Sequence, residues 1–364
     1  MASLNGASEL AIDVNDLQFA FPSSASKLPA LRGVNLVLPK GSIAILVGSN
    51  GAGKSTLLQI LAGKRMTRSG AKVLGQDVFF KTPPGVTYLG TEFVNNPVVR
   101  SDLLVSHFLQ RFSWWLQTQS RCLNSASSVL SLREAQARRD RLLDILDVDV
   151  EWHMHEVSDG ERRRVQIVQG LMAPWSILLL DEVTVDLDVL VRQNLLEFLK
   201  EECREREATV LYATHIFDGL DAFPTHVVHI QLGTTTQPVP ISWPIPSEDI
   251  PGVPKGVLAE MEAPDRSGSR MLALALRWLK EDREVRLELE KRGELRARGE
   301  SMTIASLIRT GPIEICNWSQ ALIQAPSASL LSRTPLRLDG ANLNAYEPTH
   351  RQAPVWNMTQ KLLF

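Results

Sequence analysis

A glycine-rich segment at residues 48–56 carries the residue types that bind phosphate. It follows the apolar run Ile43–Val47, which is typical of a buried strand. Glycines permit the tight, partly left-handed turn in which successive N–H groups converge on phosphate oxygens. The positive end of the following helix and an ammonium group can bind the phosphates of a nucleotide, and a hydroxyl group can bind the accompanying Mg²⁺. The residues of the segment are Gly48, Ser49, Asn50, Gly51, Ala52, Gly53, Lys54, Ser55 and Thr56.

The alternative for this segment is a strand–turn–helix that is glycine-rich for structural reasons only. The Gly-Lys-Ser ending favours the phosphate site, because Lys54 can reach the outer phosphates and the Ser55 hydroxyl can bind Mg²⁺. We therefore expect nucleotide binding here.

Two adjacent carboxylates, Asp181 and Glu182, end a second apolar strand, Ser176–Asp181. Side chains alternate in direction along a strand, so Asp181 can face a metal ion while Glu182 points toward the terminal phosphate. The pair predicts a metal ligand and a general base. Adjacent acids after an apolar strand also occur by chance, so this assignment depends on the phosphate segment upstream.

Two further positions could contact the same phosphates. Ser158 is a good N-cap for the helix predicted over Asp159–Met172, and Gly160 allows close approach to its free N–H groups, which form a second anion site. Capping alone would explain Ser158, but cations in the run Arg162–Arg164 disfavour the helix dipole and suggest an additional function. His215 follows a predicted strand, where it could touch the terminal phosphate, although a lone histidine would mean little.

The predicted elements around these residues alternate between strand and helix. This alternation indicates a mostly parallel sheet with helices on both faces and the phosphate segment at the carboxyl ends of the strands. A helical block at about residues 100–158 interrupts it as an insertion. We expect strands over residues 11–21, 31–38, 43–47, 73–80, 86–90, 176–181, 209–213 and 226–232, and helices over 55–63, 101–119, 132–148, 159–172 and 188–204.

The remaining segments differ in composition. Residues 1–10 are expected to be a flexible N-terminus, and 11–232 to form the nucleotide-binding domain. Prolines are dense in 233–256, which favours a linker, although Trp243 and Ile245 could pin it onto the domain. Residues 257–300 predict a helical extension, and 301–364 an irregular, partly disordered tail.

Composition excludes several classes of protein. The chain has 364 residues, 44% hydrophobic content and a net charge of −2, which indicates a globular protein. It lacks the basic stripe that a protein needs to bind nucleic acid directly. No apolar run approaches the ~20 residues of a membrane span, and the N-terminus has no secretory pattern. We expect a soluble, cytoplasmic protein that could also occur in the nucleus. Cys122, Cys203 and Cys316 predict free thiols, with no disulfide or zinc site.

Together and in this order, the motifs resemble the nucleotide-binding domain of ATP-binding cassette (ABC) ATPases over residues 11–232. The resemblance implies an α/β P-loop NTPase fold of the ABC type with a helical subdomain and an antiparallel β part, here followed by a C-terminal extension. It implies ATP and Mg²⁺ as cofactors and ATP hydrolysis as the activity. Since the chain holds one set of motifs, it also implies a homodimer, or a heterodimer with a related ABC ATPase, closed head to tail around two ATP molecules.

The family roles carry over residue by residue. Gly48–Thr56 resembles the Walker A segment, and Ser158 and Gly160 belong to the signature motif that faces the partner's ATP. Leu187–Asp188 is similar to the end of the D-loop. The implied metal ligands are Ser55 and Asp181, the implied catalytic residues are Glu182 and His215, and the residue implied to stack on adenine is Phe21, although an ordinary core phenylalanine would look the same.

Longer motifs narrow the resemblance to a eukaryotic group of stand-alone soluble ABC ATPases. This group includes plant subfamily I proteins and a fungal factor associated with the carbon catabolite repressor–Not complex. The motifs span residues 88–92, 157–167, 184–190 and 212–220. The group implies an ATPase that regulates a protein complex, in transcription or mRNA regulation.

Departures from the family pattern bear on this choice. Thr91 stands where the family usually has a glutamine, and Asp159 and Glu161 replace glycine and glutamine in the signature. The missing glutamine and the C-terminal extension favour the regulatory ATPase. The alternatives are the motor subunit of a transporter with a separate membrane protein, and an inactive nucleotide-sensing scaffold, which the presence of Lys54 and Glu182 disfavours.

Overall fold

The computed structural model of the chain describes residues 10–22, 29–67, 70–78, 84–92, 99–110, 132–237, 239–262 and 269–295. All of them belong to one compact unit that spans Met1–Arg296. The predictions for residues 1–9, for the helix beyond residue 110 and for the tail 301–364 lie outside the described residues, as do Cys122 and Cys316.

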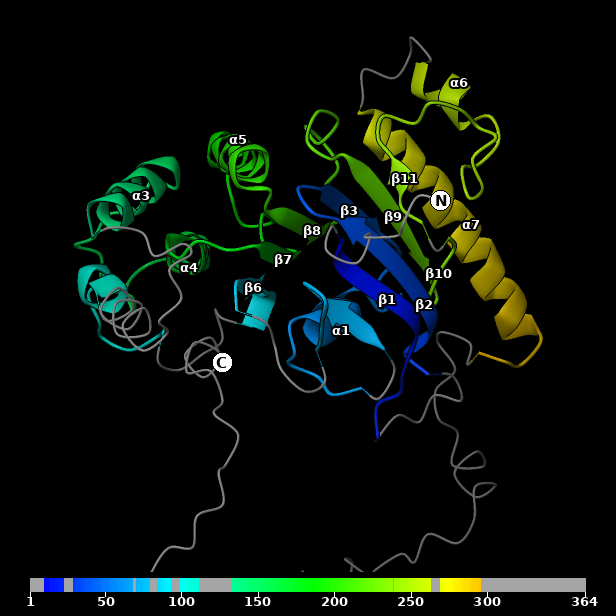
Figure 1. Cartoon of the computed structure of the whole chain (residues 1–364), viewed down its shortest axis with the longest axis horizontal. Coiled ribbons are helices and arrows are strands. Elements are labelled where there is room, and N and C mark those ends of the chain that lie inside the picture. The colour runs from blue at the N-terminus through cyan, green and yellow to red at the C-terminus, as the bar shows by residue number, and fades with distance from the viewer. Residues whose placement is uncertain are drawn as a thin grey trace, which may run out of the picture. The chain divides into compact units, whose positions relative to one another are not determined.

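A mostly parallel sheet forms the centre of the fold (Figure 1). The strands from β9 to β6 run parallel to one another, and β10 and β11 both pair antiparallel with β9. Every residue of β3, β7 and β8 is buried, which explains why these strands are nearly continuous apolar runs rather than alternating ones. In spatial order the strands are β10 (Thr234–Thr235), β9 (His226–Gln231), β3 (Ile43–Val47), β8 (Thr209–Ala213), β7 (Ile177–Asp181) and β6 (Val86–Leu89), with β11 (Ile241–Ser242) on β9.

A smaller antiparallel sheet has the order β2-β1-β4-β5. The single strand predicted over Val73–Phe80 is wrong, because the chain turns between β4 and β5. Leu74 and Gly75 both have a positive φ there, 51° and 74°, and apolar residues on both sides concealed this turn in the sequence. The strands of this sheet are β1 (Leu10–Phe19), β2 (Leu31–Pro39), β4 (Ala71–Val73) and β5 (Gln76–Asp77).

Helices cover the parallel sheet. Figure 1 shows α3, α4 and α5 together beyond β7 and β8, and the pair Arg138–Glu202 (2.6 and 2.8 Å) joins α3 to α5. Within the predicted helical block, residues 105–110 and α3 are helical in the part that the structure describes. No helix within the described ranges is long and apolar enough to cross a bilayer. The helices are α1 (Lys54–Leu61), α3 (Leu132–Ile145), α4 (Asp159–Met172), α5 (Val189–Arg206), α6 (Val257–Glu262) and α7 (Arg270–Lys291).

The proline-rich segment 233–256, which the sequence favours as a linker, lies against the parallel sheet. β11 pairs with β9, and Trp243 is buried with its indole N–H donating to the Asp221 carbonyl oxygen (2.7 Å). α7 runs beside β9 and β10 in Figure 1, with the Trp278 ring stacked on His229 at 4.7 Å between centroids. Proline excludes helix but permits an extended segment at the edge of a sheet. The buried side chains of Trp243 and Trp278 then hold this part of the chain on the sheet.

Candidate functional site

The loop between β3 and α1 is a tight turn that depends on glycine. Gly51 and Gly53 have φ values of 85° and 101°, at which a residue with a side chain is strained. A Cβ on Gly48 would lie 2.4 Å from the carbonyl oxygen of Ile230 in β9. The loop therefore lies directly on the neighbouring strand, and its shape depends on that strand.

Lys54 begins α1 and is folded back over its own loop. Its buried ammonium donates to the carbonyl oxygens of Gly48 (2.7 Å) and Ser49 (3.2 Å). Burial lowers the pKa of Lys54, and the charges of Glu182 and Asp181 oppose this shift. α1 has no side-chain cap, so the N–H groups of its first turn have no acceptor within the helix. An anion satisfies these donors and the ammonium together, so the loop fits a phosphate group.

Ser55 and Asp181 lie side by side, although they are 126 positions apart in the sequence. The Ser55 hydroxyl donates to one carboxylate oxygen of Asp181 (3.1 Å), and the Tyr88 hydroxyl donates to the other (3.2 Å). Burial raises the pKa of Asp181, and the two hydrogen bonds oppose this shift. A hydroxyl and a buried carboxylate are hard oxygen donors that suit Mg²⁺, and a cation there offsets the cost of burying the negative charge.

Glu182 and His215 form a second pair next to Asp181. Glu182 Oε2 lies 2.5 Å from His215 Nδ1. The Glu182 backbone has a φ of 55°, and its N–H donates to the carbonyl oxygen of Ala213 in β8 (2.9 Å). A non-glycine residue rarely adopts this conformation, and such strain is concentrated at functional sites. The Glu182 side chain is mostly buried and that of His215 is 59% exposed, so the histidine forms the solvent side of the pair.

These residues meet because β3, β8 and β7 are neighbouring parallel strands. β3 pairs with β8 up to Leu46–Ala213, and β8 pairs with β7 up to Ala213–Asp181. The carboxyl ends of all three strands therefore lie at the same edge of the sheet, where the loop 48–53, Glu182 and His215 follow. The sheet register thus explains the convergence of segments that are far apart in the sequence.

Phe21 lies two residues beyond β1 and is half-buried. Its ring makes an edge contact with Phe19, with centroids 5.1 Å apart, and the guanidinium of Arg65 lies 4.9 Å from its centroid. Guanidinium groups and aromatic bases both stack on aromatic faces. The ring therefore already acts as a stacking surface in this structure, and its contact with adenine stays a prediction.

Ser158 and Gly160 lie at the start of α4. The Ser158 side chain accepts from the Glu161 N–H (3.3 Å), and the Ser158 N–H and hydroxyl donate to the Glu161 carboxylate (2.7 and 2.8 Å). A Cβ on Gly160 would lie 3.0 Å from the carbonyl oxygen of Asp186, so the helix start is close to the loop after β7. Among the described residues, the side-chain hydrogen bonds of Ser158 go to Glu161, so the structure does not bring Ser158 together with Lys54.

The three arginines of α4 bind other elements of the same chain. Arg162 is buried against the segment before the helix, where it donates to a main-chain carbonyl (2.9 Å). Arg163 donates to the carbonyl oxygen of Gly90 after β6 (2.7 Å), and Arg164 pairs with Asp188 at the start of α5 (2.7 Å). These contacts give a structural reason for cations in the first turns, without the additional function that the sequence suggested.

Two contributors to the site were missed in the sequence. Tyr88 binds Asp181, and Glu92 accepts a hydrogen bond from Gln59 of α1 (2.9 Å), whereas Thr91 is exposed. Burial first, and to a smaller extent the charge of Glu92, raise the pKa of Asp181. A carboxylate one position beyond Thr91 therefore acts on the site. The sequence does predict that the strand containing Tyr88 ends near the acidic pair. It does not show which side chains of that strand and of the turn after it face α1.

Comparison with known proteins gives two kinds of match. The family model described as ABC transporter matches residues 31–185. ABC transporter I family member 20 of Arabidopsis thaliana is 34% identical over 322 residues, which cover 84% of this chain and 88% of the plant protein. CCR4-associated factor 16 of Saccharomyces cerevisiae is 40% identical over 244 residues, which cover 62% of this chain and 77% of the yeast protein.

A solved structure supports the same fold. The dimeric structure of a post-hydrolysis state of an ATP-binding cassette, bound to ADP and Pi, matches with a TM-score of 0.51 and 19% identity. The match covers 62% of this chain and 97% of that chain. It supports an ATP-binding cassette fold for the matched part of the chain.

Proposed function

This chain belongs to the ATP-binding cassette family, and we propose on this basis that it hydrolyses ATP as a head-to-tail dimer whose opening and closing regulate a protein complex. One observation carries the proposal. At the edge of the sheet where β3, β8 and β7 end, the phosphate loop, the Ser55–Asp181 pair and the Glu182–His215 pair follow on neighbouring strands. Phosphate binding, metal binding and proton removal are thus available at one edge of the sheet.

Binding of the triphosphate is assigned to the loop and to Lys54. The Lys54 ammonium, which donates here to the carbonyl oxygens of Gly48 and Ser49, would donate to phosphate oxygens instead. The N–H groups in the first turn of α1 would donate to the same phosphates. Ser55 and Asp181 would hold Mg²⁺, which when bound neutralises negative charge on the phosphates. The lowered pKa of Lys54 reflects burial, which a bound anion would counteract.

Hydrolysis is assigned to Glu182 with the assistance of His215. The carboxylate follows β7 directly after the proposed metal ligand, and its backbone is held by the hydrogen bond to Ala213. It would orient the attacking water and accept its proton, while the adjacent imidazole would stabilise charge on the transferring phosphoryl group. Replacing the carboxylate by an amide should therefore remove hydrolysis and retain nucleotide binding.

The dimer follows from what one copy lacks. Ser158, the signature residue, bonds within α4 and not at the phosphate loop of its own chain, so a second copy is proposed to supply it. Apolar side chains next to this region are exposed: Val189 is 84% and Leu190 is 67% exposed at the start of α5, and Val185 is 40% exposed in the loop after β7. A cluster of exposed apolar side chains is typical of an interface, and a two-fold arrangement would complete both sites at once.

Regulation of a protein complex is the finer part of the proposal. It draws on the yeast relative, whose name describes it as associated with CCR4, and on the replacement of the usual glutamine by Thr91. The alternative, service to a separate membrane transporter, draws on the name of the plant relative. Purification of the native chain with its partners separates the two, since recovery of a multi-span membrane protein would defeat the regulatory role.

The enzymatic part is tested with Glu182→Gln in the full chain. Phosphate release should fall to background, and ATP with Mg²⁺ should convert the monomer into a dimer in size-exclusion chromatography with light scattering. Glu197→Gln is the matched control, because Glu197 is an exposed glutamate on α5. It should hydrolyse ATP like the wild type.

The results that refute the proposal are equally specific. A Glu182→Gln chain that hydrolyses ATP at the wild-type rate would exclude Glu182 as the base. A variant that binds ATP and stays monomeric at saturating nucleotide would exclude the dimer.

A further inference from the structure

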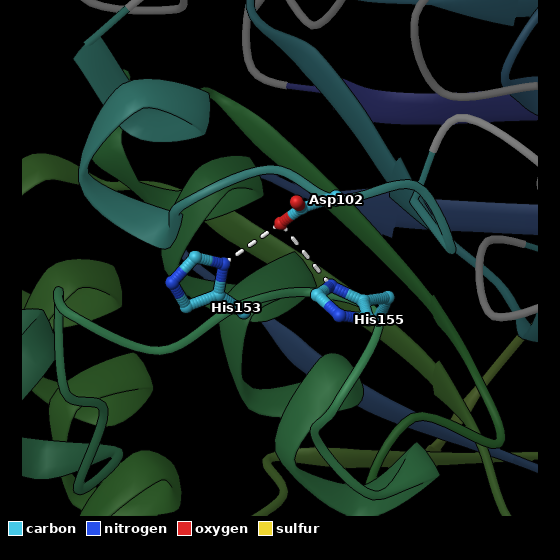
Figure 2. A group of neighbouring side chains, drawn as sticks. All are labelled: Asp102, His153 and His155. Carbon is cyan, nitrogen blue, oxygen red and sulfur yellow. Dashed lines mark hydrogen bonds and ion pairs between the residues drawn. The ribbon is translucent and has the colours of Figure 1, made fainter.

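An exposed cluster of two histidines and an aspartate lies ahead of α4, outside the proposed nucleotide site. Asp102, His153 and His155 offer ligand atoms that all lie within 4.8 Å of one another. Figure 2 shows the Asp102 carboxylate between the two imidazole rings, with one of its oxygens directed at both. Among the residues that the structure describes, these three form the one group of His, Cys, Asp or Glu side chains whose ligand atoms are close enough to share a metal ion.

Main-chain pairing brings together the two segments that carry the three side chains. An antiparallel bridge and two hydrogen bonds of 2.9 Å join residues 103–105 to residues 152–154. His153 stands in the bridge, and His155 lies in the turn that follows, which is closed by the hydrogen bond from the Glu156 N–H to the His153 carbonyl oxygen (3.0 Å). Met154 between them is fully buried. The cluster is thus assembled by the backbone, and a ligand need not order a free loop in order to bind.

The distances between the ligand atoms fit a metal ion. Asp102 Oδ1 lies 2.8 Å from His153 Nδ1 and 3.3 Å from His155 Nδ1. Two ligands of a tetrahedral zinc ion, each about 2.1 Å from the metal, lie about 3.4 Å apart. Small rotations of the side chains therefore suffice to place an ion between them.

The donor types and the local charge favour a divalent transition metal. Imidazole nitrogen with carboxylate oxygen suits zinc and its neighbours in the first row. The hydrogen bond to Asp102 raises the pKa of His153, and the charges of Asp102, Glu156 and Glu151 act in the same direction. The hydrogen bond from His153 lowers the pKa of Asp102. The Asp102 carboxylate and the nearby acids Glu151 and Glu156 thus give the cluster a local negative charge that favours a cation.

We propose that Asp102, His153 and His155 form a binding site for Zn²⁺ or a chemically similar divalent ion, separate from the nucleotide site. The three side chains are between 39% and 73% exposed, so water completes the coordination. The donor set is incomplete without water, which is the pattern of an open site rather than of a closed structural one.

The site is linked to the start of α4. The Arg162 guanidinium donates to the carbonyl oxygen of Met154 (2.9 Å) and to Asp159 in the first turn of the helix (2.5 Å). A metal ion that joins Asp102 to both histidines therefore stabilises the segment that leads into Ser158. Metal occupancy would restrict the position of that residue.

The test uses the full chain without nucleotide and without a histidine tag. Zn²⁺ is titrated by calorimetry, and Co²⁺ by its visible absorption. One Zn²⁺ per chain is expected, and His153→Ala and His155→Ala should each weaken binding by at least about tenfold, because loss of even an outer-shell partner of a ligand typically costs about 10–100-fold in metal affinity. His107→Ala is the matched control, because His107 is an exposed histidine in the adjoining helical residues 105–110. It should bind Zn²⁺ like the wild type.

Equal Zn²⁺ affinity in the wild type and in the double variant His153→Ala/His155→Ala would overturn the site and leave only a hydrogen-bonded cluster. A second measurement needs no variant. Zn²⁺ should slow hydrogen exchange of the Val105 and Met154 amides, which form the two hydrogen bonds beside the site. Exchange that is unchanged at saturating Zn²⁺ would also overturn the proposal.

Discussion

Replacing Gly233 by alanine should destabilise the fold and weaken nucleotide binding, although no sequence motif includes this residue. Gly233 lies between β9 and β10 with a φ of 86°. Its N–H donates to the carbonyl oxygen of Ala52 in the phosphate loop (2.9 Å), and its own carbonyl oxygen accepts from the Arg32 N–H in β2 (2.6 Å). One residue therefore joins the phosphate loop to both sheets.

The magnitude follows from two terms. An alanine at this φ costs about 1–2 kcal/mol because its Cβ crowds the backbone. A Cβ on Gly233 would also lie 2.5 Å from the Ala30 carbonyl oxygen, and a backbone atom cannot rotate away as a side chain can. Overpacking of this kind costs about 1–3 kcal/mol, so the variant should lose about 2–5 kcal/mol in total. Relief of the contact requires movement of Gly233 or Ala30, and the hydrogen bond to Ala52 is lost or lengthened.

Gly219→Ala is the matched control, since Gly219 also has a positive φ of 74° but a Cβ there would meet nothing within 4 Å. Thermal unfolding followed by circular dichroism should place Gly233→Ala below this control by about 2–4 °C for each additional kcal/mol. Only Gly233→Ala should weaken binding of a fluorescent ATP analogue. If the two variants melt within 1 °C of each other and bind the analogue equally, the packing argument for Gly233 is wrong.

Three further predictions test other parts of the structure. Glu202→Ala should cost about 3–5 kcal/mol in urea unfolding because it leaves Arg138 unpaired between helices, whereas the exposed Glu205→Ala should change little. Trp278→Ala should cost about 3–5 kcal/mol by the same method if α7 belongs to the core, and an unchanged midpoint would show that α7 is not docked. Burial lowers the pKa of His226 in the folded protein. Below the ordinary histidine pKa of about 6.5, the unfolded state therefore binds more protons than the folded state, and the free energy of unfolding should fall as the pH drops from 7 to 5. A His226→Gln chain should show a smaller fall, and an equal fall would assign the acid sensitivity to other groups.

The centre of the fold could be predicted because its strands are buried on both faces. The predicted strands Ile43–Val47 and Thr209–Ala213 have the bounds of β3 and β8, since a parallel strand that is buried on both faces is a short apolar run with sharp ends. The proximity of Ser55 and Asp181 follows in the same way, because parallel strands place their carboxyl ends at one edge. Their roles toward nucleotide and metal stay predictions.

Contacts that depend on register could not be predicted. Tyr88 reaches Asp181 because β6 pairs with β7 so that Tyr88 stands opposite Leu179, and a slip by one residue would turn its side chain to the other face. Glu92 contacts Gln59 because a short turn follows β6 next to α1. No local pattern in the sequence distinguishes these arrangements from their alternatives, since each depends on a partner far away in the chain.

The described part of the chain after residue 233, up to residue 295, includes a helix that supports the strand beneath the glycine-rich loop 48–53. Gly48 lies against the carbonyl oxygen of Ile230, and the residues on either side of Ile230 bind one buried aspartate of α7: His229 Nε2 and Gln231 Nε2 each lie 2.9 Å from Asp282 Oδ1. The similarity to the plant relative covers 84% of the chain, which exceeds the 222 of 364 residues in 11–232, so it too extends past that domain. The loop lies on β9, and α7 is hydrogen-bonded to the same strand. Changes in the docking of α7 therefore act on the strand that supports the loop. A partner that binds this helix has a direct physical route to the proposed nucleotide site.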